Sequence, residues 1–350
     1  MTTTALGKSQ VSVLYADVSY PELTDAELSK IIGISPGRIS TIRSQLIRER
    51  YYREVKIPAL DLLGFEGIGA VMLNLRDAHI ADDSSHRKTV NDLCRSPGVL
   101  YAVESGDQLM ILTAFPRMAS FEAFADEAFE VGCAVSDADC EQITASFPLS
   151  ISHIYSFWDF SSLLHDRFAV NVPLPSRHTP AMGKPVRNPD LSEDEARVLE
   201  LMIRDPVGND ADLATRAELG LSTFRRTKER IMSQSLCRRA FVPEISKMGF
   251  ELVVFSLLRL NPCRSKSGDV DRIKSLVSPW PFILMSRKSK ALIGHCFTNY
   301  TSYEKYSSRV LRELKKGSVH LDTIQTISCS TAGMKEIKPL DFSGLFPAMI

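Results

Sequence analysis

The sequence has no excess charge of either sign, no closely spaced cysteine pair and no long apolar run. Its 350 residues contain 42 Lys plus Arg and 42 Asp plus Glu, so any affinity for nucleic acid must come from local basic patches. The seven cysteines form no CxxC pair, which favours free thiols in a reducing compartment over disulfides or a zinc site. No apolar stretch has the length of a membrane span, and the N-terminus lacks the apolar core of a signal peptide. We therefore expect a soluble, cytoplasmic protein.

Enzyme motifs are also missing. There is no P-loop, no dinucleotide-binding glycine motif, no HExxH and no Gly-x-Ser-x-Gly. The seven histidines are scattered, and only His295, inside an apolar run at 291–297, is expected to be partly buried. Its simplest interpretation is a core or interface histidine rather than a ligand or base. The sequence thus predicts no catalytic residue, no metal site and no cofactor, and indicates that the protein is not an enzyme.

What the sequence does contain is a repeat. Arg50-Tyr51-Tyr52-Arg53-Glu54-Val55-Lys56-Ile57-Pro58, followed by Gly64-Phe65-Glu66, is echoed by Cys237-Arg238-Arg239-Ala240-Phe241-Val242-Pro243 and Gly249-Phe250-Glu251. A spacing of about 185 residues is too long for a solenoid repeat. We interpret it as a two-part module that was duplicated and fused.

Each copy begins with a pattern typical of a winged helix-turn-helix, over residues 7–58 and 191–243. In the first copy we expect helices at 9–18, at 25–32 and from Pro36 onward, with Gly33 in the turn at positive φ. In the second we expect helices at 192–203, at 210–218 and after a cap at Ser222, with Gly220 in the turn. Wing strands are predicted at 52–57 and 236–242.

Behind each wing the periodicity predicts a strand–helix–strand–strand–helix–strand order, which is typical of a ferredoxin-like domain. The expected strands are 67–75, 99–104, 108–114 and 142–148 in residues 64–165, and 251–260, 281–285, 291–297 and 319–327 in residues 249–335. The expected helices are 85–94, 120–131, 269–276 and 302–315. Residues 166–190 hold five of the 18 prolines and are predicted to be an extended linker. The predicted fold class is α+β, with two such modules related by a pseudo-two-fold axis. The uncovered faces of their sheets would pair within the chain as a pseudo-dimer. Assembly of two chains into a homodimer is a further possibility.

Positive charge gathers on the third helix and wing of each copy. Base reading needs side chains on the early, exposed face of a recognition helix, and phosphate contacts need flexible cations around it. The candidate DNA-contacting residues are Arg38, Ser40, Thr41, Arg43, Ser44, Arg53 and Lys56 in the first copy, and Thr223, Arg225, Arg226, Lys228, Arg230, Arg238 and Arg239 in the second. An ordinary solvated helix face is the alternative interpretation of either cluster.

The run from Ile34-Ser35 through Arg43 and Leu46, the wing, and Ile57-Pro58-Ala59-Leu60-Asp61-Leu62-Leu63-Gly64-Phe65 resembles the Lrp/AsnC family of transcription regulators. The resemblance implies an N-terminal helix-turn-helix and a C-terminal ligand-sensing ferredoxin-like domain. Ser105-Gly106-Asp107 looks like the family's hairpin near the effector pocket, which makes these three residues the candidate effector site. In the second copy the hairpin is Ser286-Arg287-Lys288-Ser289-Lys290, without the glycine or the acid, so the first copy is the expected host.

We therefore predict a sequence-specific regulator that binds double-stranded DNA and responds to a small molecule. One alternative is an Lrp-like sensor or interaction module that does not bind DNA. The other is an enzyme similar to siroheme decarboxylases, which share the Lrp-like architecture and use histidine and arginine near the sheet. Neither copy shows a histidine-rich hairpin.

Overall fold

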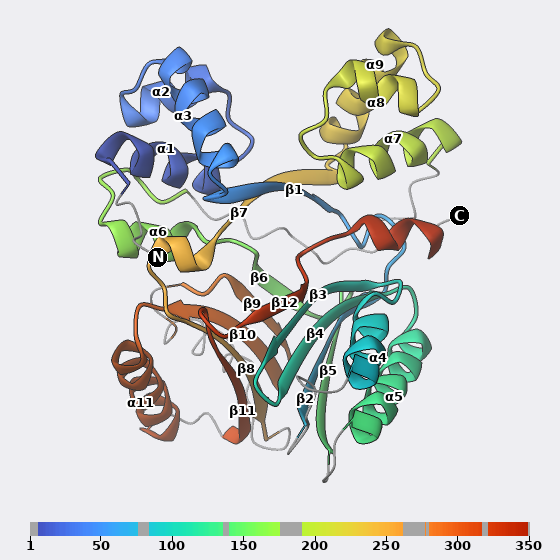
Figure 1. Cartoon of the computed structure of the whole chain (residues 1–350), viewed down its shortest axis with the longest axis vertical. Coiled ribbons are helices and arrows are strands. Elements are labelled where there is room, and N and C mark those ends of the chain that lie inside the picture. The colour runs from blue at the N-terminus through green and yellow to red at the C-terminus, as the bar shows by residue number, and fades with distance from the viewer. Residues whose placement is uncertain are drawn as a thin grey trace. The chain divides into compact units, whose positions relative to one another are not determined.

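The computed structural model describes residues 6–75, 84–135, 140–175, 191–261, 277, 280–316 and 321–348. It is a mixed α/β fold with antiparallel sheets (Figure 1). The described helices are α1 (Lys8–Ser19), α2 (Asp25–Ile32), α3 (Pro36–Arg48), α4 (Ser84–Cys94), α5 (Met118–Val135), α6 (Ser161–Phe168), α7 (Glu193–Arg204), α8 (Asp210–Arg216), α9 (Leu221–Ser233) and α11 (Tyr300–Lys316), with 3-10 helices η1 (Ile245–Met248) and η2 (Ser343–Ala348). None of these helices is long and apolar enough to cross a membrane.

The strands are β1 (Tyr52–Pro58), β2 (Gly67–Leu75), β3 (Val99–Ser105), β4 (Gln108–Phe115), β5 (Cys140–Pro148), β6 (His153–Phe157), β7 (Cys237–Pro243), β8 (Leu252–Leu260), β9 (Ile283–Arg287), β10 (Lys290–Phe297), β11 (Leu321–Ser330) and β12 (Lys335–Lys338). The helix expected at 269–276 and most of the expected linker lie outside the described residues.

Local capping chemistry sets the helix starts. The side chain of Thr24 accepts a hydrogen bond from the backbone N–H of Glu27 at the start of α2, and Ser192 caps α7 in the same way. Gly33 ends α2 with φ of 69°, as expected for a turn that needs positive φ. The second copy differs from the prediction, because α9 is capped by Gly220 rather than Ser222. There the positive φ, 58°, falls on Glu218.

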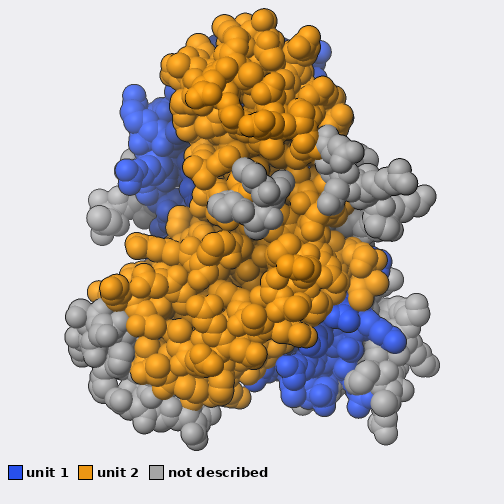
Figure 2. All heavy atoms as spheres, turned by 90° about the vertical axis from the view of Figure 1, so that its right-hand side faces the viewer, with its two compact units in different colours: residues 1–54, 153–181, 239–332 blue, residues 55–152, 182–238, 333–350 orange. Residues whose placement is uncertain are grey.

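The chain divides into two compact units, coloured separately in Figure 2. Unit 1 comprises residues 1–54, 153–181 and 239–332. Unit 2 comprises residues 55–152, 182–238 and 333–350. Each unit therefore collects three separate stretches of chain, whereas the expected domains were consecutive segments.

The sheet of unit 1 has the strand order β11-β8-β10-β9-β6. Strand β10 pairs antiparallel with β8 and β9, and His295 lies opposite Val254 in the β8 register. The edge strand β6 comes from a part of the chain more than a hundred residues earlier and pairs with β9, where Ile154 lies opposite Met285. The apolar core under α11 is built by Leu258, Leu260, Val277, Leu284, Ala291, Ile293 and Val310.

The sheet of unit 2 has the order β12-β3-β4-β2-β5. Its edge strand β12 follows the second copy in sequence and pairs with β3, where Lys335 lies opposite Glu104. Helices α4 and α5 pack on this sheet over a core that includes Val71, Leu93, Ile111 and Phe121. The sequence pattern did not identify β6, α6 or β12, although β6 and β12 hold equivalent edge positions in their two sheets, next to β9 and β3.

The two strands expected as wings, β1 and β7, pair with each other in a two-stranded sheet. Both strands span a boundary between the units, at residues 54/55 and 238/239. Within unit 1, Tyr52 packs edge-on against Phe241 with ring centroids 5.0 Å apart. Both predicted strands are therefore present. Their backbone groups form hydrogen bonds with each other, so the strands are not two separate wings.

Candidate functional site

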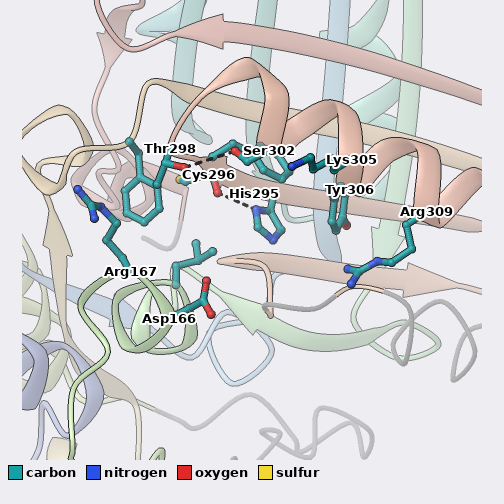
Figure 3. Close-up of a pocket in the computed structure, with 12 residues that line it drawn as sticks. Asp166, Arg167, His295, Cys296, Thr298, Ser302, Lys305, Tyr306 and Arg309 are labelled. Atoms are coloured by element: carbon teal, nitrogen blue, oxygen red, sulfur yellow. Dashed lines mark hydrogen bonds between the residues drawn. The ribbon is translucent and has the colours of Figure 1, made fainter.

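A cavity of about 330 Å³ opens in unit 1 beside β10, α11 and α6 (Figure 3). Its volume lies at the small end of the range for small-molecule sites. Twelve residues line it, namely Leu163, Asp166, Arg167, Phe250, His295, Cys296, Phe297, Thr298, Ser302, Lys305, Tyr306 and Arg309. The lining combines aromatic and apolar surface with several charged groups, a composition that binds and orients a small molecule.

Helix α11 contributes a polar stripe to this cavity. Ser302, Lys305, Tyr306 and Arg309 follow one another at helical spacings of three, one and three, which places them on one side of the helix. The helix start is fixed by Asn299, whose side-chain oxygen accepts a hydrogen bond of 2.8 Å from the N–H of Ser302. Figure 3 shows Lys305, Tyr306 and Arg309 in a row along the helix.

His295 reaches the cavity from the centre of β10 and is only 2% exposed. Its Nδ1 lies 2.9 Å from the carbonyl oxygen of Cys296. Because a carbonyl can only accept, Nδ1 carries the hydrogen, which in the neutral ring leaves Nε2 as the acceptor nitrogen. The ring stacks on Phe297 with centroids 4.4 Å apart and lies 5.0 Å from the Tyr306 ring. The imidazole is therefore held in one orientation by its neighbours.

Tyr306 stands between His295 and Arg309. Its hydroxyl is buried and makes no hydrogen bond with any residue that the structure describes. Burial raises the pKa of this phenol, and the positive charge of Arg309, whose guanidinium carbon lies 5.8 Å from the ring centre, only partly offsets that effect. Tyr306 therefore keeps its proton at neutral pH.

Arg167 approaches the cavity from α6. Its Nε donates a hydrogen bond of 3.0 Å to the carbonyl of Met248. Gly249 follows with φ of 76°, and a Cβ at this glycine would lie 2.5 Å from an Nη atom of Arg167. The glycine thus provides the left-handed turn and also the space that the guanidinium occupies.

The charges of the lining define the class of ligand. Arg167, Lys305 and Arg309 are cationic, and Asp166 is the one carboxylate among the lining residues. Guanidinium and ammonium groups bind carboxylates and phosphates, and stacked rings bind flat aromatic surfaces. The cavity therefore suits a flat, anionic molecule.

The corresponding positions of unit 2 carry different chemistry. Strand β4 pairs with β2 as β10 pairs with β8, so Thr113 occupies the register position of His295. The helices can be compared by counting residues from Phe297 in unit 1 and from Phe115 in unit 2. The positions that hold Lys305, Tyr306 and Arg309 in α11 then hold Ala123, Phe124 and Glu127 in α5. Phe115 and Phe121 stack there at 5.2 Å. None of these four replacements is a cation, so the cationic lining is found at these positions in unit 1 and not in unit 2.

Ion pairs engage several of the cations predicted to contact DNA. Arg43 has a side chain only 16% exposed and forms a bidentate contact with Asp17, which is itself 1% exposed. Arg43 also binds Asp25, and Tyr52 donates to Asp17 at 2.6 Å. Burial by itself would lower the pKa of Arg43, but hydrogen bonds and charges from the two aspartates outweigh it and raise the pKa. This arginine is a structural residue of the three-helix cluster.

The second helix cluster also contains ion pairs, but their cations are more exposed than Arg43. Lys228 and Arg225 bind Asp210 at 2.7 and 3.4 Å, and their hydrogen bonds and charges hold the pKa of Asp210 below its ordinary value. Arg230 pairs with Glu195 at 2.6 Å, and Arg239 pairs with Glu54 at 2.6 Å.

The remaining candidates are distributed over both units. Those on exposed surface are Arg38, Ser40, Thr41, Ser44, Arg226 and Arg238, and those of intermediate exposure are Arg53, Lys56 and Thr223. No candidate DNA-contacting residue lines the cavity of unit 1.

The candidate effector hairpin lies in unit 2. Ser105 ends β3, and Gly106 and Asp107 form the turn to β4, with Gly106 at φ of 61°. The carbonyl of Asp107 accepts a hydrogen bond of 2.7 Å from the N–H of Leu75. The geometry is that of a tight hairpin turn, which favours glycine for conformational reasons. These residues do not line the unit 1 cavity. The sequence predicted an effector site at the hairpin of the first copy, whereas most of the cavity lining comes from residues 250–309.

Sequence reasoning passed over Arg167, Lys305, Tyr306 and Arg309. The available signal was the stripe Ser302-x-x-Lys305-Tyr306-x-x-Arg309 on a predicted helix. It was hidden because such a stripe is also the ordinary pattern of a solvated helix face. His295 was singled out and its burial is confirmed.

No protein-family model matches the chain, and no curated protein is significantly similar in sequence. The crystal structure of the siroheme decarboxylase NirDL matches 97% of this chain and 98% of its own, with 13% identity and a TM-score of 0.54. The same enzyme in complex with an iron-uroporphyrin III analogue matches 98% of both chains, with 12% identity and a TM-score of 0.55. An AsnC family regulator from Agrobacterium tumefaciens matches 40% of this chain and 90% of its own, with 18% identity and a TM-score of 0.32.

These findings correct two predictions, that the chain is a DNA-binding transcription regulator and that it is not an enzyme. The protein whose fold it shares from end to end is an enzyme. On the basic helices, Arg43 is held by Asp17 and Asp25, and Lys228 and Arg230 form ion pairs with Asp210 and Glu195.

Proposed function

We propose that the protein is a decarboxylase of an anionic tetrapyrrole, with its site in the unit 1 cavity. The observation that carries this proposal is the convergence of Arg167, Lys305 and Arg309 on a cavity that also contains His295 and Tyr306. The end-to-end similarity to a siroheme decarboxylase supports it, because that protein binds an iron-uroporphyrin III analogue on the same fold.

We also propose that the two sheets are ferredoxin-like copies derived by tandem duplication, each following a helix-turn-helix. The support is the matching strand order, β3-β4-β2-β5 in unit 2 and β9-β10-β8-β11 in unit 1. Each set follows three helices and one strand of the two-stranded sheet. In this view the duplicated fold supplies the scaffold of an enzyme, and the second copy carries the site.

The three cations would bind the carboxylates of the tetrapyrrole. A charge-assisted hydrogen bond of this kind contributes about 1.5–3 kcal/mol. The His295–Phe297 pair would lie against the face or edge of the ring. Since the cavity measures about 330 Å³, it would enclose one edge of the macrocycle and leave the other acidic side chains in solvent.

The proposal is tested by titrating the purified chain with siroheme while following the tetrapyrrole absorbance, and by detecting loss of CO₂ from the bound pigment by mass spectrometry. We expect one saturable complex and a decarboxylated product. Lys305→Glu replaces an attractive charge by a repulsive one, so its affinity should fall about 10- to 100-fold or more. Arg226→Glu, on the exposed surface of α9 outside the cavity, is the matched control and should bind as the unaltered protein does.

Three outcomes would contradict the proposal. Absence of any siroheme complex would remove the ligand class. Binding without loss of CO₂ would indicate a sensor of tetrapyrroles rather than an enzyme. Equal weakening by Lys305→Glu and Arg226→Glu would mean that the ligand responds to overall charge and not to this cavity.

A further inference from the structure

We propose that the phenol of Tyr306 donates the proton that replaces the departing carboxylate in the unit 1 cavity. This inference rests on the proposed decarboxylase function and assigns its acid catalyst. The similarity to other proteins does not suggest this residue. The hydroxyl of Tyr306 is buried and lacks a hydrogen-bond partner among the described residues.

The hydroxyl of Tyr306 lacks a hydrogen bond in the protein interior, where such a group lowers the stability of the fold. It is buried and has no hydrogen-bond partner among the described residues, although Tyr306 lines both the main cavity and a smaller one beneath α11. A buried hydroxyl without a partner destabilises a fold and requires an explanation. A bound molecule in the cavity that accepts its hydrogen bond supplies that explanation.

The neighbours of Tyr306 suit it to proton donation. The guanidinium carbon of Arg309 lies 5.8 Å from the ring centre, so a positive charge is close when the phenolate forms. The His295 ring lies 5.0 Å away on the other side (Figure 3). Lys305 precedes Tyr306 on the same helix face and would hold the substrate carboxylate beside it.

His295 is less suited to the same step. Its Nδ1 hydrogen is engaged by the Cys296 carbonyl at 2.9 Å, and the neutral ring presents an acceptor at Nε2. Its stacking on Phe297 also fixes the plane of the ring. We therefore assign His295 an orienting role for the ligand and Tyr306 the role of acid.

The step balances without an oxidant. The bond between the side-chain carbon and its carboxylate carbon breaks, CO₂ leaves, and the electron pair remains on the side-chain carbon, delocalised into the pyrrole ring. The O–H bond of Tyr306 then breaks, and its proton forms the new C–H bond. The phenolate, next to Arg309, recovers a proton from water and closes the cycle.

The test compares Tyr306→Phe with the unaltered chain in siroheme titrations and in single-turnover measurements of CO₂ loss. The substitution removes only the hydroxyl, so siroheme affinity should stay unchanged within error. The rate of CO₂ loss should fall by about 10²- to 10⁴-fold, the usual contribution of a general acid. The variant should melt no lower than the parent, since it loses an unsatisfied buried group. Tyr300→Phe, at a residue 65% exposed outside the cavity, is the control and should keep the full rate.

A second variant separates catalysis from packing. Replacing Tyr306 with 3-fluorotyrosine keeps the hydroxyl and makes the phenol a stronger acid, so the single-turnover rate should recover from the Tyr306→Phe level to at least that of the parent. The role of Tyr306 is overturned, and the proposed function left standing, if the parent and Tyr306→Phe are equally active, or if the 3-fluorotyrosine protein is as slow as Tyr306→Phe. An inactive parent overturns the proposed function and this inference with it.

Discussion

Arg43 shows at the scale of one residue why a cluster of cations is ambiguous in sequence. Its position on a predicted recognition helix suggested a base contact, and its actual partners are Asp17 and Asp25 from two preceding helices. These aspartates stand 26 and 18 positions away in the chain. A pattern of charges along one helix says nothing of acids on another, and only the packing of α1, α2 and α3 brings them together.

The structural role of Arg43 can be tested by Arg43→Met. Removal of one partner from a buried pair leaves Asp17 uncompensated, so the free energy of unfolding should fall by about 3–5 kcal/mol. Arg38→Ala, on the exposed face of the same helix, should change it by no more than about 0.5 kcal/mol. Urea denaturation of both variants measures the difference. Equal, small effects would mean that the aspartates are solvated without Arg43.

Among elements, α5 and α11 differ in the charges that they carry at matching positions. Both helices follow the last strand of a hairpin at the same spacing, from Phe115 to Met118 and from Phe297 to Tyr300. The face that carries cations on α11 carries alanine, phenylalanine and glutamate on α5. Both helices follow their hairpins at the same spacing, so side-chain identity alone sets this difference in charge.

The turn between η1 and β8 is the second element-scale feature, and Gly249→Ala tests it. Alanine at φ of 76° is strained by about 1–2 kcal/mol, and its Cβ would also meet Arg167. Gly33→Ala is a matched control, because Gly33 has φ of 69° and open space around its Cβ position. Both variants should lose similar stability in thermal melts, whereas only Gly249→Ala should bind siroheme more weakly. Equal siroheme affinities would show that Arg167 does not contribute to binding.

For the whole molecule, the main finding is that neither half of the sequence holds a complete unit. Unit 1 needs β6 and α6 from residues 153–181 as well as the sheet strands of residues 239–332. Unit 2 needs β12 and η2 from the C-terminal stretch, and the N–H of Asp341 donates to the carbonyl of Leu100 there. Each unit is thus built from segments of both halves of the sequence, in an exchange of segments between the halves.

This exchange predicts the behaviour of separated halves. Residues 1–190 and 191–350, produced as two chains, should each lack a cooperative melt in far-UV circular dichroism, because each leaves sheet edges and apolar surface uncovered. Mixed together they should regain a cooperative transition. If either half alone melts cooperatively near the temperature of the full chain, the exchanged strands are dispensable and the unit boundaries are wrong.

The sequence by itself determined where most helices and strands lie. Apolar periodicity, the caps at Thr24 and Ser192 and the turn glycine at Gly33 act within a few residues, so they can be read locally. The expected strand at 67–75 and helix at 25–32 have the observed bounds. Strands β6 and β12 were missed because short strands at a sheet edge have little pattern of their own.

Only the tertiary structure decided how these elements combine and what the site is. The pairing of β6 with β9 joins residues more than a hundred positions apart, and no local pattern encodes such a choice. The cavity likewise draws on α6, β10 and α11, so that Arg167, His295 and Tyr306 meet only after folding. Burial then raises the pKa of Tyr306. This burial depends on the packing of several elements, so the sequence pattern of one helix cannot predict it.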